Sequence, residues 1–225
     1  MSRKDLALVL IDIQNESRFG IQGLEEVVHN SKQLLNACRE AGIPVVYTRQ
    51  INRADGVGLS LGEELSADGR PVFYCSDTDA VDIIADIAPL ENELVVDKYR
   101  WSSFCATSLD IFLKGLGARE LILGGLVTDG CLMTSAFDAY FRDYRLHLVR
   151  DICATTCEGG HMASIMIMAN WIYGLKVYKT SEMIKFIHGE SHYVWESKST
   201  APFDFTPENM REQYARLDSE AVLFT

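Results

Sequence analysis

The stretch "GGLVTDGCLMTSAFDAY", residues 124–140, leads from two glycines through a polar turn to a cysteine that opens a segment of helix-forming residues. The apolar run "ELILGGL" (120–126) precedes it and predicts a strand, and we expect a helix from about Cys131 to Phe141. A thiol at such a turn suits a nucleophile, because a helix N-terminus lowers a thiol's pKa and offers free N–H groups. A buried structural thiol is the alternative, and the spacing alone leaves both open.

The same alternation of strand and helix continues on both sides of this stretch. Parallel strands buried on both faces appear as continuous apolar runs, such as "LALVLI" (6–11). The other expected strands are 43–48, 93–98, 145–151 and 175–180, and the other expected helices are 24–41, 107–117 and 161–174. This order predicts an α/β protein, a Rossmann-like three-layer sandwich with a central, mainly six-stranded parallel sheet.

Two segments do not follow the alternation. Residues 50–75 contain several glycines and weak periodicity, so we expect an irregular, lid-like excursion within a domain of residues 1–180. Residues 181–225 form a tail rich in aromatic side chains, among them Trp195 and Phe203. Such a tail needs burial, so we expect it to pack on its own domain or on a neighbouring subunit of a homo-oligomer, a dimer or a tetramer.

Composition excludes several classes of partner. The net charge of −11 argues against nucleic acid, whose partners are normally basic, and no apolar run approaches the ~20 residues that span a bilayer. The N-terminal segment is interpreted as a first strand, not a signal peptide. The six cysteines include no CxxC pair, which favours a reduced, cytoplasmic location. "GLVTDGC" and "GLGARE" lack the residues of phosphate-binding and dinucleotide-binding loops, so we expect no nucleotide cofactor.

Two charged residues follow strands at the same expected edge of the sheet. Asp12 interrupts the first apolar run at its carboxyl end, and Lys98 ends another. Ligands of open α/β sheets bind at the carboxyl ends of the strands, where Cys131 is also expected. The alternative is an Asp12–Lys98 ion pair that only closes the sheet edge. If Cys131 is a nucleophile, iodoacetamide should label it faster than the other five cysteines.

Three segments together resemble the cysteine hydrolases of the isochorismatase-like superfamily: "ALVLIDIQN", "VVDKYRWSSFCATSLD" and "LILGGLVTDGCLMTSAFDAYFRDYRLHLVRD". The resemblance covers residues 5 to 180. It implies a catalytic triad of Asp12, Lys98 and Cys131, and a non-proline cis peptide near Val127–Thr128. It also implies an oxyanion hole formed by the backbone of Val127, Thr128 and Cys131.

Departures from the family bear on the substrate. Its nicotinamidase branch has an Asp-x-His…His metal site after the second strand, whereas "TRQINRADGVGLS" (48–60) has no histidine, so we expect neither metal nor other cofactor. Its isochorismate branch can replace the cysteine by glycine, so Cys131 favours amide chemistry. The resemblance therefore predicts an amidohydrolase of the N-carbamoylsarcosine, biuret or ureidoacrylate branch, which cleaves a small amide, carbamoyl or ureido compound through a thioester. An ether hydrolase and a catalytically silent binding protein are the alternatives.

Residues close to the expected triad in sequence are weaker candidates for substrate contacts. They are Arg18, Tyr99, Arg100 and Trp101. An arginine beside such a site could pair with a substrate carboxylate. His161, at the start of a helix, is expected to cap or pack, and His188 and His192 are expected at the surface.

Overall fold

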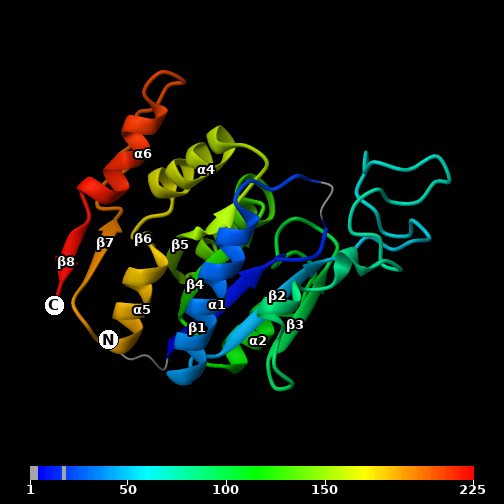
Figure 1. The fold of residues 1–225 in the computed structure, drawn as a ribbon, viewed down its shortest axis with the longest axis horizontal. Coiled ribbons are helices and arrows are strands. Elements are labelled where there is room, and N and C mark those ends of the chain that lie inside the picture. Colours follow the sequence, from blue (N-terminus) through cyan, green and yellow to red (C-terminus); the bar gives the residue numbers. More distant parts are fainter. Residues whose placement is uncertain (1–4, 17–18) are drawn as a thin grey trace.

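The computed structural model describes residues 5–16 and 19–225, which form one sheet with helices on both faces (Figure 1). The sheet has eight strands in the order β3-β2-β1-β4-β5-β6-β7-β8. The strands from β3 to β6 are parallel, and β7 and β8 are antiparallel to their neighbours. The predicted α/β architecture is confirmed, with two antiparallel strands in addition to the six parallel ones.

The strands are β1 (Leu6–Ile11), β2 (Val45–Gln50), β3 (Leu94–Lys98), β4 (Glu120–Leu126), β5 (Arg145–Ala154), β6 (Lys176–Tyr178), β7 (His192–Glu196) and β8 (Val222–Phe224). The α-helices are α1 (Leu24–Glu40), α2 (Leu109–Gly115), α3 (Met133–Tyr140), α4 (Glu158–Trp171), α5 (Thr180–His188) and α6 (Met210–Ser219). A π-helical turn, η4 (Thr128–Leu132), joins β4 to α3. The short 3₁₀ helices η2 (Asp79–Val81) and η3 (Ala85–Ile87) lie between β2 and β3.

The helices divide between the two faces as right-handed crossovers require. Helices α1 and α5 pack against each other on the face toward the viewer of Figure 1. On the other face α3 packs against α4, and α4 packs against α6. The centre of the sheet is dry, because every residue of β1 and of β4 is buried. This explains the continuous apolar runs in the sequence.

The glycine pair of β4 marks the closest approach between strands. A Cβ on Gly125, whose φ is +135°, would lie 2.0 Å from the carbonyl oxygen of Ile11 on β1. A Cβ on Gly124 would meet the side chain of Ile152 on β5 at 2.2 Å. Both positions therefore exclude a side chain, and β1 can lie against β4 just before the polar residues that follow each strand.

The tail extends the sheet. Strand β7 pairs with β6, and β8 pairs with β7 at the edge. Trp195 and Phe203 are buried against each other, with ring centroids 5.1 Å apart. The edge strand keeps Val222, Leu223 and Phe224 exposed.

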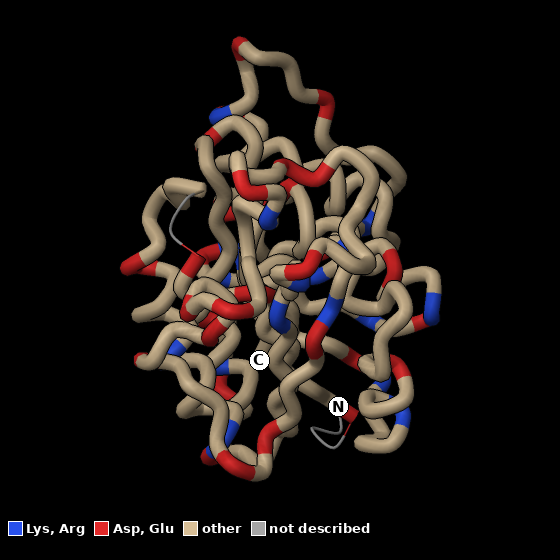
Figure 2. The backbone as a smooth tube through the Cα atoms, turned by 90° about the vertical axis from the view of Figure 1, so that its right-hand side faces the viewer, with Lys and Arg blue, Asp and Glu red and all other residues tan. Residues whose placement is uncertain are grey.

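Surface charge and apolar length agree with the composition. Figure 2 shows acidic and basic residues interspersed over the chain, and the 32 acidic residues outnumber the 21 basic ones. Among the described residues, no helix has the length and apolar character that a bilayer crossing requires.

Substituting Gly125 by alanine should destabilise the protein by at least about 2 kcal/mol, because its Cβ would overlap the Ile11 backbone and its φ disfavours a side chain. The measurement is the midpoint of chemical unfolding. Gly115→Ala is the matched control: it lies in α2 with open space around its Cβ, and it should leave stability unchanged or raise it by up to about 1 kcal/mol. Equal stability of the two variants would contradict the close approach.

Candidate active site

Three elements deliver the predicted catalytic side chains to one edge of the sheet. Asp12 follows β1, Lys98 is the last residue of β3, and Cys131 lies in the η4 turn after β4. Lys98 Nζ lies 2.6 Å from Asp12 Oδ2 and 3.3 Å from Cys131 Sγ. Asp12 has a φ of 51°, a left-handed conformation that aspartate tolerates better than most residues. The structure thus brings the three residues into direct contact.

The ammonium of Lys98 is enclosed by acceptors. Besides Asp12 and Cys131, it donates to Gln50 Oε1 at 2.8 Å and to the carbonyl oxygen of Arg100 at 3.0 Å. Its side chain has no solvent exposure. Burial lowers its pKa, but the charges of Asp12 and of a Cys131 thiolate act more strongly in the other direction, so the pKa lies above its ordinary value. Lys98 is therefore a cation at neutral pH.

A chain of buried hydroxyl groups supports Asp12 and Cys131 from behind. Thr48 donates to Asp12 Oδ1 at 2.7 Å, and Ser103 Oγ lies 3.4 Å from the Thr48 hydroxyl. Ser135 Oγ lies 3.0 Å from Ser103 Oγ and donates to the carbonyl oxygen of Cys131 at 2.6 Å. Sequence reasoning missed these three residues because isolated Ser and Thr carry no motif. Their places within β2, before α2 and within α3 become meaningful only once the elements are packed.

The Cys131 thiol differs from the sequence-based expectation in two respects. It lies within the π-helical turn, where the Val127 carbonyl accepts from Gly130 N at 3.1 Å and Leu132 N at 3.2 Å, and α3 begins only at Met133. Burial raises its pKa to about 12, with a further contribution from Asp12 that the charge of Lys98 only partly offsets. The expected lowering of the thiol pKa is therefore wrong for this state. A base must remove the proton before sulfur can attack.

The backbone shortly before Cys131 has the expected non-proline cis peptide, displaced by one position. The cis peptide joins Leu126 to Val127, one bond before Val127–Thr128. Val127 and Cys131 line the cavity described next, whereas the Thr128 side chain is buried. The oxyanion role of these backbone groups stays a prediction.

A cavity of about 400 Å³ opens in front of Cys131. The segment between β2 and β3, drawn in cyan at the right of Figure 1, supplies much of its wall. Phe19 and Phe73 stack across this wall, with ring centroids 4.2 Å apart and planes 9° apart. The lining residues are Phe19, Gln50, Asn52, Ser60, Gly62, Glu63, Glu64, Phe73, Tyr74, Trp101, Val127, Asp129, Gly130 and Cys131. The predicted lid segment thus borders the site.

The weaker candidates for substrate contacts do not all line the cavity. Trp101 lines the cavity, but Tyr99 and Arg100 do not. Arg100 is used structurally, since its guanidinium donates to the carbonyl oxygens of Gly58 and Tyr99 and its own carbonyl holds Lys98. Arg18 lies outside the described residues. The aromatic residues Phe73 and Tyr74 were missed because the fold of the irregular segment is not readable from sequence pattern, and Phe19 was missed because only the fold brings its loop to Phe73.

The histidines also depart in part from expectation. Cys157, and not His161, caps α4, since its Sγ accepts from Gly160 N at 3.3 Å. His161 bridges Thr128 and Tyr214 by hydrogen bonds. His188 is partly exposed, and His192 packs between the rings of Tyr178 and Phe224.

Metal-binding side chains do not gather in the described part of the chain. There, no group of three or more His, Cys, Asp or Glu side chains is placed to hold an ion. The expectation that the reaction needs neither metal nor other cofactor stays a prediction.

Comparison with known proteins shows the family to which the chain belongs. A family model described as "Isochorismatase domain" matches residues 6–180. The chain belongs to the isochorismatase family. Nicotinamidase 3 of Arabidopsis thaliana is 30% identical over 168 residues, which are 74% of this chain and 81% of the relative. An uncharacterized isochorismatase family protein of Bacillus subtilis is 29% identical over 154 residues, covering 67% of this chain and 78% of the relative.

Solved structures of the isochorismatase family share the fold. A cysteine hydrolase from Pseudomonas syringae superposes with a TM-score of 0.74 at 23% identity, covering 84% of this chain and 95% of that one. The N-carbamoylsarcosine amidase of Thermoplasma acidophilum superposes with a TM-score of 0.64 at 26% identity, covering 79% and 98%. The family is one of hydrolases, and its members include amidohydrolases and isochorismatases.

The geometry corrects the expected order of alkylation. Cys105 and Cys157 are exposed and Cys131 is buried, so iodoacetamide should modify the two exposed thiols before Cys131 at neutral pH. The rate at Cys131 should rise roughly tenfold per pH unit up to its pKa, because only the thiolate reacts. Mass spectrometry of peptides gives each rate.

Two variants test the electrostatics of the thiol. Asp12→Asn removes a charge that raises the Cys131 pKa, so alkylation of Cys131 should become faster at a given pH. Lys98→Met removes the charge that lowers the pKa and should slow alkylation. Cys105 serves as the internal control, and circular dichroism shows whether each variant is folded. Slower alkylation in Asp12→Asn would contradict the assignment.

Proposed function

We propose that the protein is a cysteine-dependent amidohydrolase that cleaves the C–N bond of a small linear amide, carbamoyl or ureido compound. The observation that carries the proposal is the buried Lys98 ammonium, which contacts both Asp12 and Cys131 at the base of a cavity of about 400 Å³. A carboxylate, a cation and a thiol at these distances supply a base, a fixed positive charge and a nucleophile.

The first half-reaction acylates the enzyme. Asp12 removes the thiol proton, and Cys131 Sγ attacks the amide carbon to form a C–S bond while the carbonyl oxygen becomes an oxyanion. The backbone of Val127, Thr128 and Cys131 stabilises that oxyanion. The tetrahedral intermediate collapses, the C–N bond breaks, and the departing nitrogen takes the proton from Asp12. Ammonia or an amine leaves, and a thioester remains on Cys131.

The second half-reaction releases the acid. Asp12 removes a proton from water, and the resulting hydroxide attacks the thioester carbon. The C–S bond then breaks, and the proton on Asp12 returns to Cys131 Sγ. Lys98 stays protonated through both halves, in keeping with its raised pKa, and balances whichever of Asp12 and Cys131 is negative.

The known relatives support amide chemistry in this family. The names of Nicotinamidase 3, of the ureidoacrylate amidohydrolase of Acinetobacter baylyi and of N-carbamoylsarcosine amidase each describe cleavage of a C–N bond. An isochorismatase of Bacillus subtilis aligns over 95% of this chain at 28% identity, which keeps ether hydrolysis as the second candidate. The buried thiol in contact with Lys98 favours the amide reaction, because vinyl-ether hydrolysis needs no sulfur nucleophile.

Purified protein should release ammonia from at least one member of a panel of carbamoyl compounds, ureido compounds and primary amides. Cys131→Ala should abolish this activity, and Asp12→Asn should lower kcat by about 10²- to 10⁴-fold with KM little changed, as loss of a general base does. An ammonia-coupled assay measures both. The acyl-enzyme should appear in the intact mass as an adduct on Cys131.

Cys105→Ala is the matched control, because its thiol is exposed and outside the cavity. Full activity of Cys131→Ala on an amide would sink the mechanism. Turnover of isochorismate that survives Cys131→Ala, with no amide hydrolysed, would establish the ether hydrolase instead. Stoichiometric binding of amides without turnover would identify a silent binding protein.

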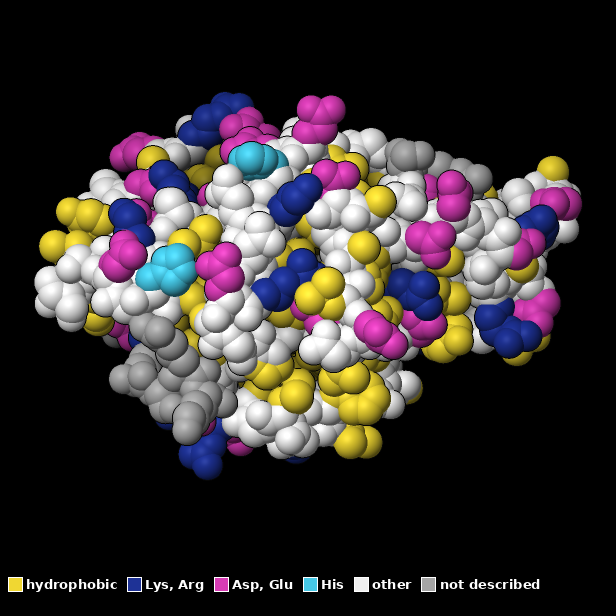
Figure 3. Space-filling view, turned by 60° about the horizontal axis from the view of Figure 1, so that its bottom comes forward, with side chains coloured by type: hydrophobic (Ala, Val, Ile, Leu, Met, Phe, Trp, Pro, Cys, Tyr) yellow, Lys and Arg dark blue, Asp and Glu magenta, His cyan; other side chains and the backbone are white. Residues whose placement is uncertain are grey.

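We also infer that the protein is a homo-oligomer in which the tail forms an interface. Large exposed apolar side chains occur on β8 and elsewhere, and Figure 3 shows such side chains on one face of the molecule. Deleting the tail after residue 185 would also remove β7 from the sheet and change the fold, so single substitutions on β8 are the better test of the interface.

Light scattering should give a multiple of the 25.2 kDa chain mass, and Leu223→Lys should shift it toward the monomer. Leu65→Lys, on a leucine of the excursion that is 51% exposed against 49% for Leu223, is the control and should not dissociate the assembly. A monomeric mass for the unmodified protein would refute the inference.

A further inference from the structure

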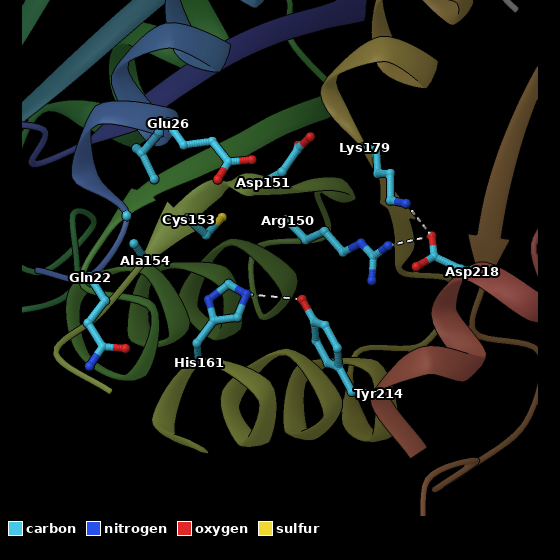
Figure 4. A pocket seen from close by; sticks show the side chains of 12 residues that line it. Gln22, Glu26, Arg150, Asp151, Cys153, Ala154, His161, Lys179, Tyr214 and Asp218 are labelled. Atoms are coloured by element: carbon cyan, nitrogen blue, oxygen red, sulfur yellow. Dashed lines mark hydrogen bonds and ion pairs between the residues drawn. The ribbon is translucent and has the colours of Figure 1, made fainter. Parts of the chain in front are cut away.

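A second cavity, of about 330 Å³, is walled by the start of α1, the end of β5, α4 and α6 (Figure 4). Its side chains form three interactions with α6. Tyr214 Oη lies 3.0 Å from His161 Nε2, and Asp218 pairs with Arg150 and with Lys179. Figure 4 shows Tyr214 extending from α6 toward the imidazole of His161, while Arg150 reaches Asp218. The helix is thus held at two positions one turn apart.

The imidazole of His161 continues from this cavity to the catalytic turn. Its Nδ1 lies 3.0 Å from Thr128 Oγ1, on the first residue of η4. The two hydrogen bonds of the ring span 33 residues toward Thr128 and 53 residues toward Tyr214. One side chain therefore connects the C-terminal helix to the turn that carries Cys131.

The protonation states suit a continuous hydrogen-bonded chain. Burial lowers the pKa of His161 and the nearby Arg150 lowers it further, so the ring is neutral at pH 7, with one N–H donor and one acceptor nitrogen. Burial raises the pKa of Tyr214 to about 12, so the phenol keeps its proton. Because Thr128 and Tyr214 each have a hydroxyl that donates and accepts, either tautomer of His161 satisfies both contacts.

The first turn of α4 and the loop before it contact the next residue of the catalytic turn as well. Thr155 donates to Asp129 Oδ1 at 2.6 Å, and a Cβ on Gly160 would come within 2.8 Å of Asp129 Oδ2. The first two residues of η4 are thus held from the same side. This matters because backbone N–H groups stabilise a developing oxyanion only when they are fixed in place, and a displacement of about 1 Å can cost about 10²-fold in rate.

We propose that His161 is a positioning residue for the reaction: it fixes Thr128 in the catalytic turn and makes that turn depend on Tyr214 of the C-terminal helix α6. In this role His161 does not contact the substrate and exchanges no proton with it. The proposal rests on the proposed function only for its kinetic consequences, since the hydrogen bonds and the rigidity of the turn exist without a substrate.

Two amide substitutions of His161 separate its contacts. The amide of asparagine reaches the place of Nδ1, and the longer glutamine reaches the place of Nε2. His161→Asn should keep the contact with Thr128 and retain kcat within about fivefold, whereas His161→Gln should lose it and lower kcat about 10- to 100-fold with KM within about twofold. Tyr214→Phe should lower kcat by less, and His161→Gln/Tyr214→Phe should be no slower than His161→Gln alone, because the two act through one contact.

Hydrogen exchange gives a readout that does not depend on substrate. Peptide amides within residues 126–133 should exchange faster in His161→Gln and in Tyr214→Phe than in the unmodified protein. The matched controls are His188→Gln and Tyr173→Phe, at partly exposed positions outside both cavities, and should leave these amides unchanged. If no amide in the panel is hydrolysed, the proposed function fails and the exchange result still decides the positioning role.

Specific outcomes would overturn the role of His161. They are exchange in the turn that does not respond to Tyr214→Phe, equal kcat for His161→Asn and His161→Gln, or a rise in KM with kcat unchanged. Additive losses in the double variant would also overturn it, since they would mean that Tyr214 acts independently of the imidazole.

Discussion

The ion pair between Asp12 and Lys98, without exposure to solvent on either side chain, is the constraint on which the site depends. Two buried charges cost several kcal/mol of desolvation each unless partners surround them. Here Thr48 supports the carboxylate, and Gln50 and a carbonyl oxygen support the ammonium, so neither charge relies on the other alone. The hydrogen-bonding groups come from β2 and from the residues beside β3. The buried ion pair therefore depends on the order of the central strands, in which β2 lies between β1 and β3.

The sheet can present these groups together only because its backbone packs closely at the centre. Gly125 lets β4 approach the end of β1, which is the point where Asp12 leaves the strand. A side chain there would separate the turn that carries Cys131 from the Asp12 carboxylate, which accepts the thiol proton in the proposed mechanism. Packing at this position is therefore part of the geometry of the candidate nucleophile, although the glycine carries no chemistry of its own.

The sequence was sufficient for the elements with strong local signals and insufficient where tertiary packing decides. The buried runs around Leu8 and Leu123 predicted parallel strands, and Asp12, Lys98 and Cys131 could be placed at one edge from strand direction alone. The pKa of Cys131 could not be predicted from the sequence, because burial outweighs the effect expected of a helix N-terminus and burial depends on the whole fold. The walls of the cavity come from an irregular segment without periodicity, and β7 was missed because its aromatic residues alternate with polar ones in a short strand.

The ammonium of Lys98 has three hydrogens but four neighbouring acceptors. When Cys131 is a neutral thiol, its sulfur is the weakest of the four acceptors, so the three hydrogens point preferentially at the three oxygen acceptors. In the proposed reaction Cys131 loses its proton and Asp12 gains one, which reverses this order, and the nitrogen can then turn its hydrogens toward sulfur by rotation about a single bond. The hydrogen bonds of Lys98 can thus shift as negative charge moves from oxygen to sulfur, without the movement of any heavy atom.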